Sequence, residues 1–118
     1  MGFWKTIISE FKSESRKLID LKCIKKNQNL SDELDFFTLI NNGSIRYSDD
    51  YITINNYELE LIKKVPFLKK DSDGWRLYED PRGTKVSISP LGEKGTISLF
   101  HFKSKEVKCQ IVFNLIDF

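Results

Sequence analysis

The C-terminal segment 107–116 constrains the fold of this chain more than any other stretch. Its apolar side chains recur at every second position and are separated by a second, more polar set; the apolar set is Val107, Cys109, Ile111, Phe113 and Leu115. Because successive side chains of a strand point to opposite faces, this spacing predicts a strand with one buried face. Segment 96–102 before it is rich in β-branched and aromatic residues, and the polar link 103–106 predicts a hairpin between the two.

Turn-forming residues recur at strand-like intervals through the middle of the chain. Between them, segments 51–55, 57–65, 75–79 and 85–89 have strand character. The sequence Asp-Pro-Arg-Gly at 80–83 suits a type I turn that joins two antiparallel strands. Segment 57–65 also fits a helical pattern, so its assignment stays open.

The N-terminal segment carries apolar residues at helical spacing, from Phe3 to about Lys22. This spacing predicts an amphipathic helix over residues 1–22 that packs on the sheet. The alternative is a helix that lies on a membrane surface through Trp4 and Phe11. The acidic residues Glu10 and Glu14 argue against that alternative.

The segment 31–47 combines two signals. Ser31, followed by Asp32 and Glu33, favours a helical turn at 31–34 at most. The sequence Asn-Asn-Gly at 41–43 supplies the positive φ angles of a tight turn, and it predicts a hairpin over 35–47.

Taken together, these patterns predict an α+β fold. An N-terminal amphipathic helix would be followed by a curved antiparallel meander of seven or eight short strands, mostly within 35–118 and closed like a barrel or a sandwich. At 118 residues, with nine Phe, four Tyr and two Trp, the chain is expected to form a single domain, 1–118, with its own core.

The two cysteines, Cys23 and Cys109, are too few and too far apart for a disulfide framework. We expect both to be reduced, buried thiols in a cytoplasmic protein; a single bridge between them is the alternative. No stretch reaches the roughly 18 apolar residues of a transmembrane helix.

Motifs that carry chemistry are absent from the sequence. With His101 as the only histidine, no His-rich zinc site and no mechanism with two imidazoles can form. A nucleophile–base pair of Cys109 and His101 on adjacent strands is conceivable, but an apolar face disfavours the thiolate. Asp71-Ser72-Asp73-Gly74 resembles the start of a calcium loop and lacks the glutamate that should follow Gly74. We therefore expect no enzymatic activity, no catalytic residue, no cofactor and no metal.

The central part of the chain is acidic. Residues 31–60 carry seven acidic residues and one basic residue, although the whole chain has a net charge of +2. Aromatic side chains lie among these acids, and acidic groups beside aromatics suit an interface with a basic protein. The predicted partner-binding residues are Asp32, Glu33, Asp35, Tyr47, Asp49, Asp50, Tyr51, Tyr57, Glu58 and Glu60.

This pattern favours a protein that occludes a basic partner, in the manner of an inhibitor or an immunity protein that neutralises a toxin or nuclease. The alternative for the acids is an ordinary solvated face. A second function class is a nucleic-acid-binding barrel that uses the aromatic strands and four lysines, Lys63, Lys64, Lys69 and Lys70. A peripheral membrane or lipid-headgroup module is the third class.

Overall fold

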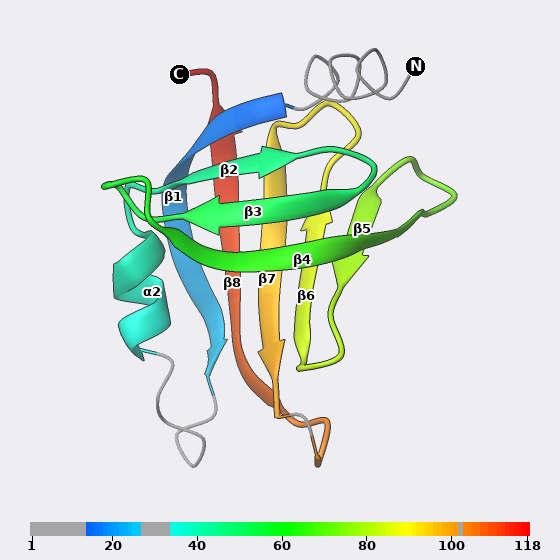
Figure 1. Ribbon diagram of the computed structural model, residues 1–118. Coiled ribbons are helices and arrows are strands. Elements are labelled where there is room, and N and C mark those ends of the chain that lie inside the picture. The colour runs from blue at the N-terminus through cyan, green and yellow to red at the C-terminus, as the bar shows by residue number, and fades with distance from the viewer. Residues whose placement is uncertain (1–13, 27–33, 102) are drawn as a thin grey trace.

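The computed structural model describes residues 14–26, 34–101 and 103–118. In it, eight antiparallel strands form a closed barrel, and each strand lies next to the one that follows it in the sequence. A short helix, α2, lies between the first two strands. Figure 1 shows β2, β3 and β4 crossing at a steep angle in front of β6, β7 and β8. The elements are β1 (Glu14–Lys26), α2 (Leu34–Ile40), β2 (Ser44–Tyr47), β3 (Tyr51–Asn55), β4 (Leu61–Lys70), β5 (Arg76–Glu79), β6 (Thr84–Ile88), β7 (Lys94–Phe100) and β8 (Val107–Ile116).

Strand β1 closes the barrel because it pairs with both β2 and β8. Its first residues pair with β2, with Glu14 opposite Tyr47. From Lys17 onward it also pairs with β8, where Leu18 lies opposite Leu115. Closure leaves no unpaired sheet edge between β8 and β1.

The prediction of an N-terminal helix over 1–22 is wrong for residues 14–22, which belong to β1; residues 1–13 lie outside the described part of the chain. A bulge explains the misleading spacing. Residues 20 and 21 of β1 together face one residue of β8, between the pairs Ile19–Asn114 and Lys22–Val112. The extra residue shifts the alternation, so that Leu18 and Leu21, three positions apart, both pack in the core. A bulged strand thus has the apolar spacing of a helix.

The predicted hairpin over 35–47 is also wrong in its first arm. Residues 35–40 were expected to form a strand, and they belong to the helix α2. Phe36 and Ile40, four positions apart, are buried on one face of this helix. The Asn-Asn-Gly sequence ends the helix: Asn42 has a φ of 62°, and the amide of Gly43 donates to the carbonyl oxygen of Ile40 at 2.8 Å. The positive φ expected of a hairpin turn therefore serves as a helix C-cap.

The fold is nearly all β, and the predicted α+β class with an N-terminal amphipathic helix is wrong. The antiparallel meander itself is present. The turn at 80–83 joins β5 to β6, and β7 pairs with β8 as expected. Segment 57–65 is displaced, because its strand, β4, begins at Leu61.

The inside of the barrel is filled by side chains. All eight strands contribute residues that are at most 2% exposed: Leu18, Ile45, Ile52, Ile54, Val65, Tyr78, Thr84, Val86, Ile88, Ile97, Cys109 and Ile111. Helix α2 contributes Phe36 and Ile40 to the same cluster. The interior is therefore a packed core.

The two cysteines differ in environment. Cys109 is buried, as predicted, but Cys23 is exposed on β1, so the prediction of a second buried thiol is wrong. Both are free thiols, and in the register of the barrel Cys23 lies opposite Ile111.

Candidate functional site

The barrel does not bring the ten predicted partner-binding residues onto one surface. Asp32 and Glu33 lie outside the described residues, and Asp35 belongs to α2. Tyr47 is 4% exposed and belongs to the core. Burial raises its pKa, and the nearby Glu14 carboxylate adds to the rise. Tyr47 is therefore a core residue with no surface to offer a partner.

The remaining six residues divide between the two ends of β3, which is five residues long. Asp49, Asp50 and Tyr51 lie at the β2–β3 turn. Asp49 pairs there with Arg76 at 3.0 Å, and the ring of Tyr51 lies 4.2 Å from the ammonium group of Lys64. The side chains of Asp49 and Tyr51 are therefore already engaged with other residues of the same protein.

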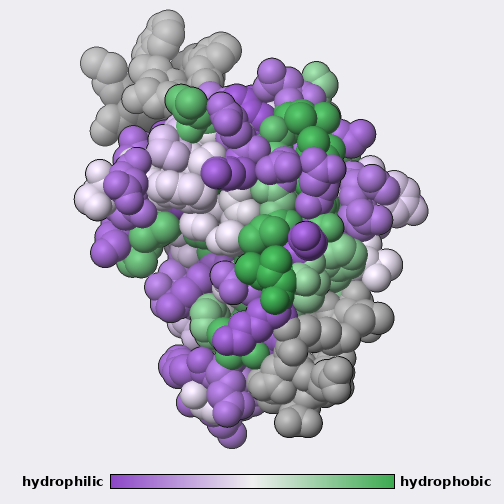
Figure 2. All heavy atoms as spheres, turned by 180° about the vertical axis from the view of Figure 1, so that it is seen from behind, coloured by the Kyte–Doolittle hydropathy of each residue, from purple (hydrophilic) through white to green (hydrophobic). Residues whose placement is uncertain are grey.

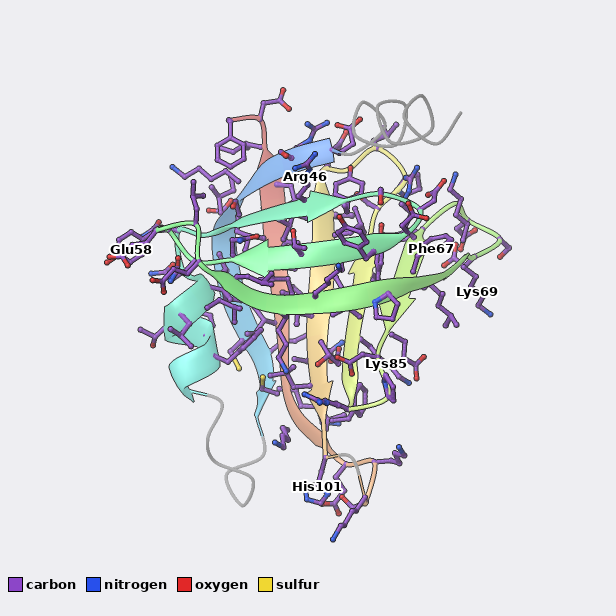
Figure 3. All side chains as sticks on the ribbon, in the orientation of Figure 1. Arg46, Glu58, Phe67, Lys69, Lys85 and His101 are labelled. Carbon is purple, nitrogen blue, oxygen red and sulfur yellow. The ribbon has the colours of Figure 1, made fainter. Side chains whose placement is uncertain are left out.

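The other end of β3 presents an exposed apolar group. In the turn between β3 and β4, Tyr57 is 69% exposed, Leu59 66% and Leu61 57%. Glu58 and Glu60 alternate with them and are also exposed. Figure 3 shows Glu58 projecting away from the barrel at this turn, with Lys69 toward the opposite end of β4. We refer to residues 55–61 as the β3–β4 turn.

Two asparagines fix the backbone of the β3–β4 turn. The buried side chain of Asn56 accepts from the amide of Glu60 at 2.9 Å, and its Nδ2 donates to the Glu60 carboxylate at 3.3 Å. The Nδ2 of Asn55 donates to the carbonyl oxygen of Leu59 at 3.1 Å. The amide of Leu59 in turn donates to the carbonyl oxygen of Asn56 at 2.9 Å. The apolar side chains are thus carried by an ordered turn.

Leu59 adopts a backbone conformation that glycine would adopt more easily. Its φ is 65°, in the left-handed region, where a residue with a Cβ is disfavoured by about 1–2 kcal/mol. The surrounding hydrogen bonds hold it there. A positive φ that the surrounding structure enforces fixes the position of the Leu59 backbone in the turn.

The acids of the β3–β4 turn make its field negative. The side chain of Glu58 accepts a hydrogen bond from the phenol of Tyr57, which raises the pKa of that phenol; the charges of Glu58 and Glu60 act in the same direction. The proton of the phenol is therefore held between Tyr57 and Glu58. An apolar centre bordered by carboxylates suits a partner with a basic rim.

The four lysines predicted for nucleic-acid binding all lie in β4. The aromatic strand with which they were combined is β7, and β5 and β6 separate the two in the barrel. The structure therefore does not assemble that predicted surface.

The residues considered for catalysis do not form a reactive centre. Cys109 is 2% exposed and pairs in register with Leu99. His101 follows the end of β7, where its Nδ1 lies 3.2 Å from both the amide nitrogen and the hydroxyl of Ser104 (Figure 3). An apolar interior position suits a packed thiol better than a nucleophile.

The sequence Asp71-Ser72-Asp73-Gly74 forms a turn. Oδ1 of Asp71 accepts from the amides of Asp73 and Trp75, at 2.9 and 3.0 Å. Among the described residues, no three His, Cys, Asp or Glu side chains are grouped closely enough to hold a metal ion. No described helix has the length and apolarity needed to cross a membrane.

The sequence prediction missed Leu59 and Leu61. Their signal is visible in hindsight, because the alternation Tyr-Glu-Leu-Glu-Leu follows the turn-forming Asn55-Asn56 directly. The pattern predicts a strand from Tyr57 onward, whereas the strand begins only at Leu61.

Comparison with known proteins gives no relative for this chain: no protein-family model, no curated protein and no solved structure matches it.

Proposed function

We propose that this barrel is a non-enzymatic protein-binding domain that occludes a basic partner, and that the β3–β4 turn is its docking element. The observation that carries the proposal is the exposure of Tyr57, Leu59 and Leu61 on a turn that is already ordered. Large apolar side chains gathered at one exposed point are typical of interaction sites. An inhibitor-like or immunity-like role against a toxin or nuclease is the form of occlusion we favour.

Order in the unbound turn lowers the entropy cost of docking. A loop that is flexible when free loses backbone freedom on binding, at about 1–2 kcal/mol for each residue whose backbone becomes fixed. The hydrogen bonds of Asn55 and Asn56 fix the backbone in advance. The apolar contacts of Tyr57 and Leu61 then contribute more fully to affinity.

The chemistry of the turn defines its partner. Tyr57 and the two leucines suit an apolar pocket. Glu58 and Glu60 favour lysines or arginines around that pocket and steer the encounter. The expected partner is a protein with an apolar depression inside a basic surface.

The proposal is tested by affinity capture from a lysate of the cells that make the protein. The bait is compared with a Tyr57→Ser/Leu61→Ser variant and with a matched control, Ile24→Ser/Leu91→Ser. The control positions are similarly exposed, at 54% and 78%, and lie on other parts of the barrel.

We expect one basic protein to be held by the unaltered chain and by the control, released as salt rises, and lost with the turn variant. Its own activity should fall when the barrel is added in stoichiometric amount. Capture that is unchanged by Tyr57→Ser/Leu61→Ser, or the absence of any protein whose capture depends on these residues, overturns the proposal.

A further inference from the structure

We propose that the outer face of β6, β7 and β8 is a second binding site that takes nucleotide units, as in single-stranded nucleic acid. It is separate from the β3–β4 turn and does not depend on the function proposed above. The site consists of two neighbouring grooves that share Thr96, which we call the outer trough. This face is turned toward the viewer in Figure 2, where pale side chains of intermediate hydropathy lie among purple hydrophilic ones.

The register of the sheet explains why this face is hollow. Thr96 of β7 lies beside Ser87 of β6, and their hydroxyls are hydrogen-bonded at 2.5 Å. Ser98 follows on β7 in the same outward-facing row. Such small side chains leave the middle of the face lower than its edges, which are occupied by longer residues.

The larger groove has a volume of about 440 Å³ and combines an aromatic ring with two cations. Trp75, just before β5, lines it together with Lys22 of β1 and Lys94 of β7. Neither lysine has an ion pair with any described residue. An indole near two lysines is suited to a ligand with a planar ring and a negative charge.

A strained bulge shapes the same groove. Asp20 lies at the first bulge of β1 with a φ of 54°, and its carboxylate accepts from Nδ2 of Asn114 at 3.1 Å. Both residues line the groove. Bulges of this kind often re-aim side chains next to functional sites. Here Asn114 lies in register with Lys94, so the amide borders the cationic part of the groove.

The smaller groove extends the trough toward β4. It has a volume of about 210 Å³, and its lining includes Leu68, Leu77, Glu79 and Lys85 together with the hydroxyls of Ser87, Thr96 and Ser98. The ammonium group of Lys85 lies 4.9 Å from the ring centroid of Phe100 and 3.9 Å from the Glu79 carboxylate. Glu79 therefore offsets the charge of Lys85, and the net positive charge of the trough lies at the end formed by Lys22 and Lys94. A floor of hydroxyl and apolar groups lies between the two ends.

Nucleotide chemistry matches this arrangement. A base can stack on the indole of Trp75, which is worth about 1–3 kcal/mol per base in single-strand binding proteins. A phosphate can lie between Lys22 and Lys94, and the hydroxyls of Ser87 and Thr96 can bond to sugar or base. None of these contacts reads base identity, so we expect little sequence preference.

Fluorescence anisotropy with labelled oligothymidylate at low salt tests the proposal on the full chain. We expect binding that weakens as salt rises. The variant Lys22→Gln/Lys94→Gln should bind about tenfold more weakly with a shallower salt dependence, and Trp75→Ala should lose affinity that Trp75→Phe partly restores. The matched control is Lys63→Gln/Lys64→Gln on β4, which should bind within about twofold of the unaltered chain.

Competition separates the forms of the ligand. Thymidine monophosphate competing as well as the oligomer would identify a single-nucleotide site, and competition by the oligomer alone would identify a strand. No binding of oligothymidylate at low salt overturns the proposal. Equal loss in the β4 control, or equal binding of polyglutamate without dependence on Trp75, shows attraction of any polyanion and also overturns it.

Discussion

The amide of Glu60 donates a 2.9 Å hydrogen bond to the side chain of Asn56, so a buried side chain fixes the backbone on the far side of the β3–β4 turn. The reciprocal bond from Asn56 Nδ2 reaches the Glu60 carboxylate. This pair holds Leu59, between them in the sequence, at its positive φ. The exposed apolar side chains of the β3–β4 turn are therefore carried by a hydrogen-bonded backbone.

Replacing Leu59 by glycine should separate stability from binding. Because Gly adopts positive φ freely, Leu59→Gly should leave the free energy of unfolding unchanged or raise it by up to about 1 kcal/mol. Capture of the basic partner should weaken, since the Leu59 side chain is lost. Urea denaturation and affinity capture measure the two effects.

Lys105 provides the matched control for that change. It has a φ of 63° and lies in the β7–β8 loop. Lys105→Gly should change stability in the same way as Leu59→Gly and leave capture intact. Equal capture by the two variants would show that Leu59 takes no part in docking.

Removing the Asn56 side chain should loosen the β3–β4 turn. Asn56→Ala deletes two hydrogen bonds at a buried position, so we expect the free energy of unfolding to fall by about 1–2 kcal/mol. Asn114→Ala removes an exposed amide with one bond to Asp20 and should cost less. If urea denaturation shows equal losses for the two variants, the Asn56 bonds do not fix the turn.

The packed interior predicts a large difference between two isoleucines. Ile97 is fully buried and Ile116 is 44% exposed. Ile97→Ala should lower the free energy of unfolding by about 2–5 kcal/mol, because it leaves a cavity in the core. Ile116→Ala should lower it by much less. Similar losses in urea denaturation would contradict a barrel interior at Ile97.

Alkaline pH should destabilise the barrel through its buried tyrosines. Burial raises the pKa of Tyr78 and of Tyr47 above the ordinary 10.0, so both stay neutral in the folded protein when the unfolded chain already loses the protons. Their stabilisation is complete below about pH 10 and is lost as the pH rises above it. Urea denaturation at increasing pH should show this fall.

Tyr78→Phe isolates the contribution of one phenol. It removes a titrating group along with a 2.7 Å hydrogen bond to the Ser48 carbonyl oxygen. The variant should be less stable at neutral pH and lose less stability above pH 10. An alkaline fall as steep as that of the unaltered chain would assign the effect to other groups.

Local patterns predicted the C-terminal hairpin because its side chains alternate without interruption. The same alternation rule fails for β1 because of the bulge at Asp20 and Leu21. One inserted residue there changes the period of two into a spacing that resembles a helix. Asn42 adopts the positive φ that the turn sequence predicted, but the element before it is a helix and not a strand. Closure between β1 and β8 depends on pairing across nearly the whole chain, which no local pattern contains.

The residues of the candidate site could be predicted only in part, because their grouping also depends on strand pairing. Composition included Tyr57, Glu58 and Glu60 among the predicted partner-binding residues, but it could not show that β3 separates them from Asp49 and Asp50. It also could not show that Tyr47 faces the core. Charge and aromatic content are properties of a segment, whereas a surface depends on how the strands pair.

Amide hydrogen exchange of the full chain, with and without its captured basic partner, tests the central claim most directly. We predict slower exchange on binding within residues 56–61 and little change at the outer trough around Thr96. Protection confined to another face of the barrel, with the β3–β4 turn exchanging as it does in the free protein, would contradict the proposed docking element.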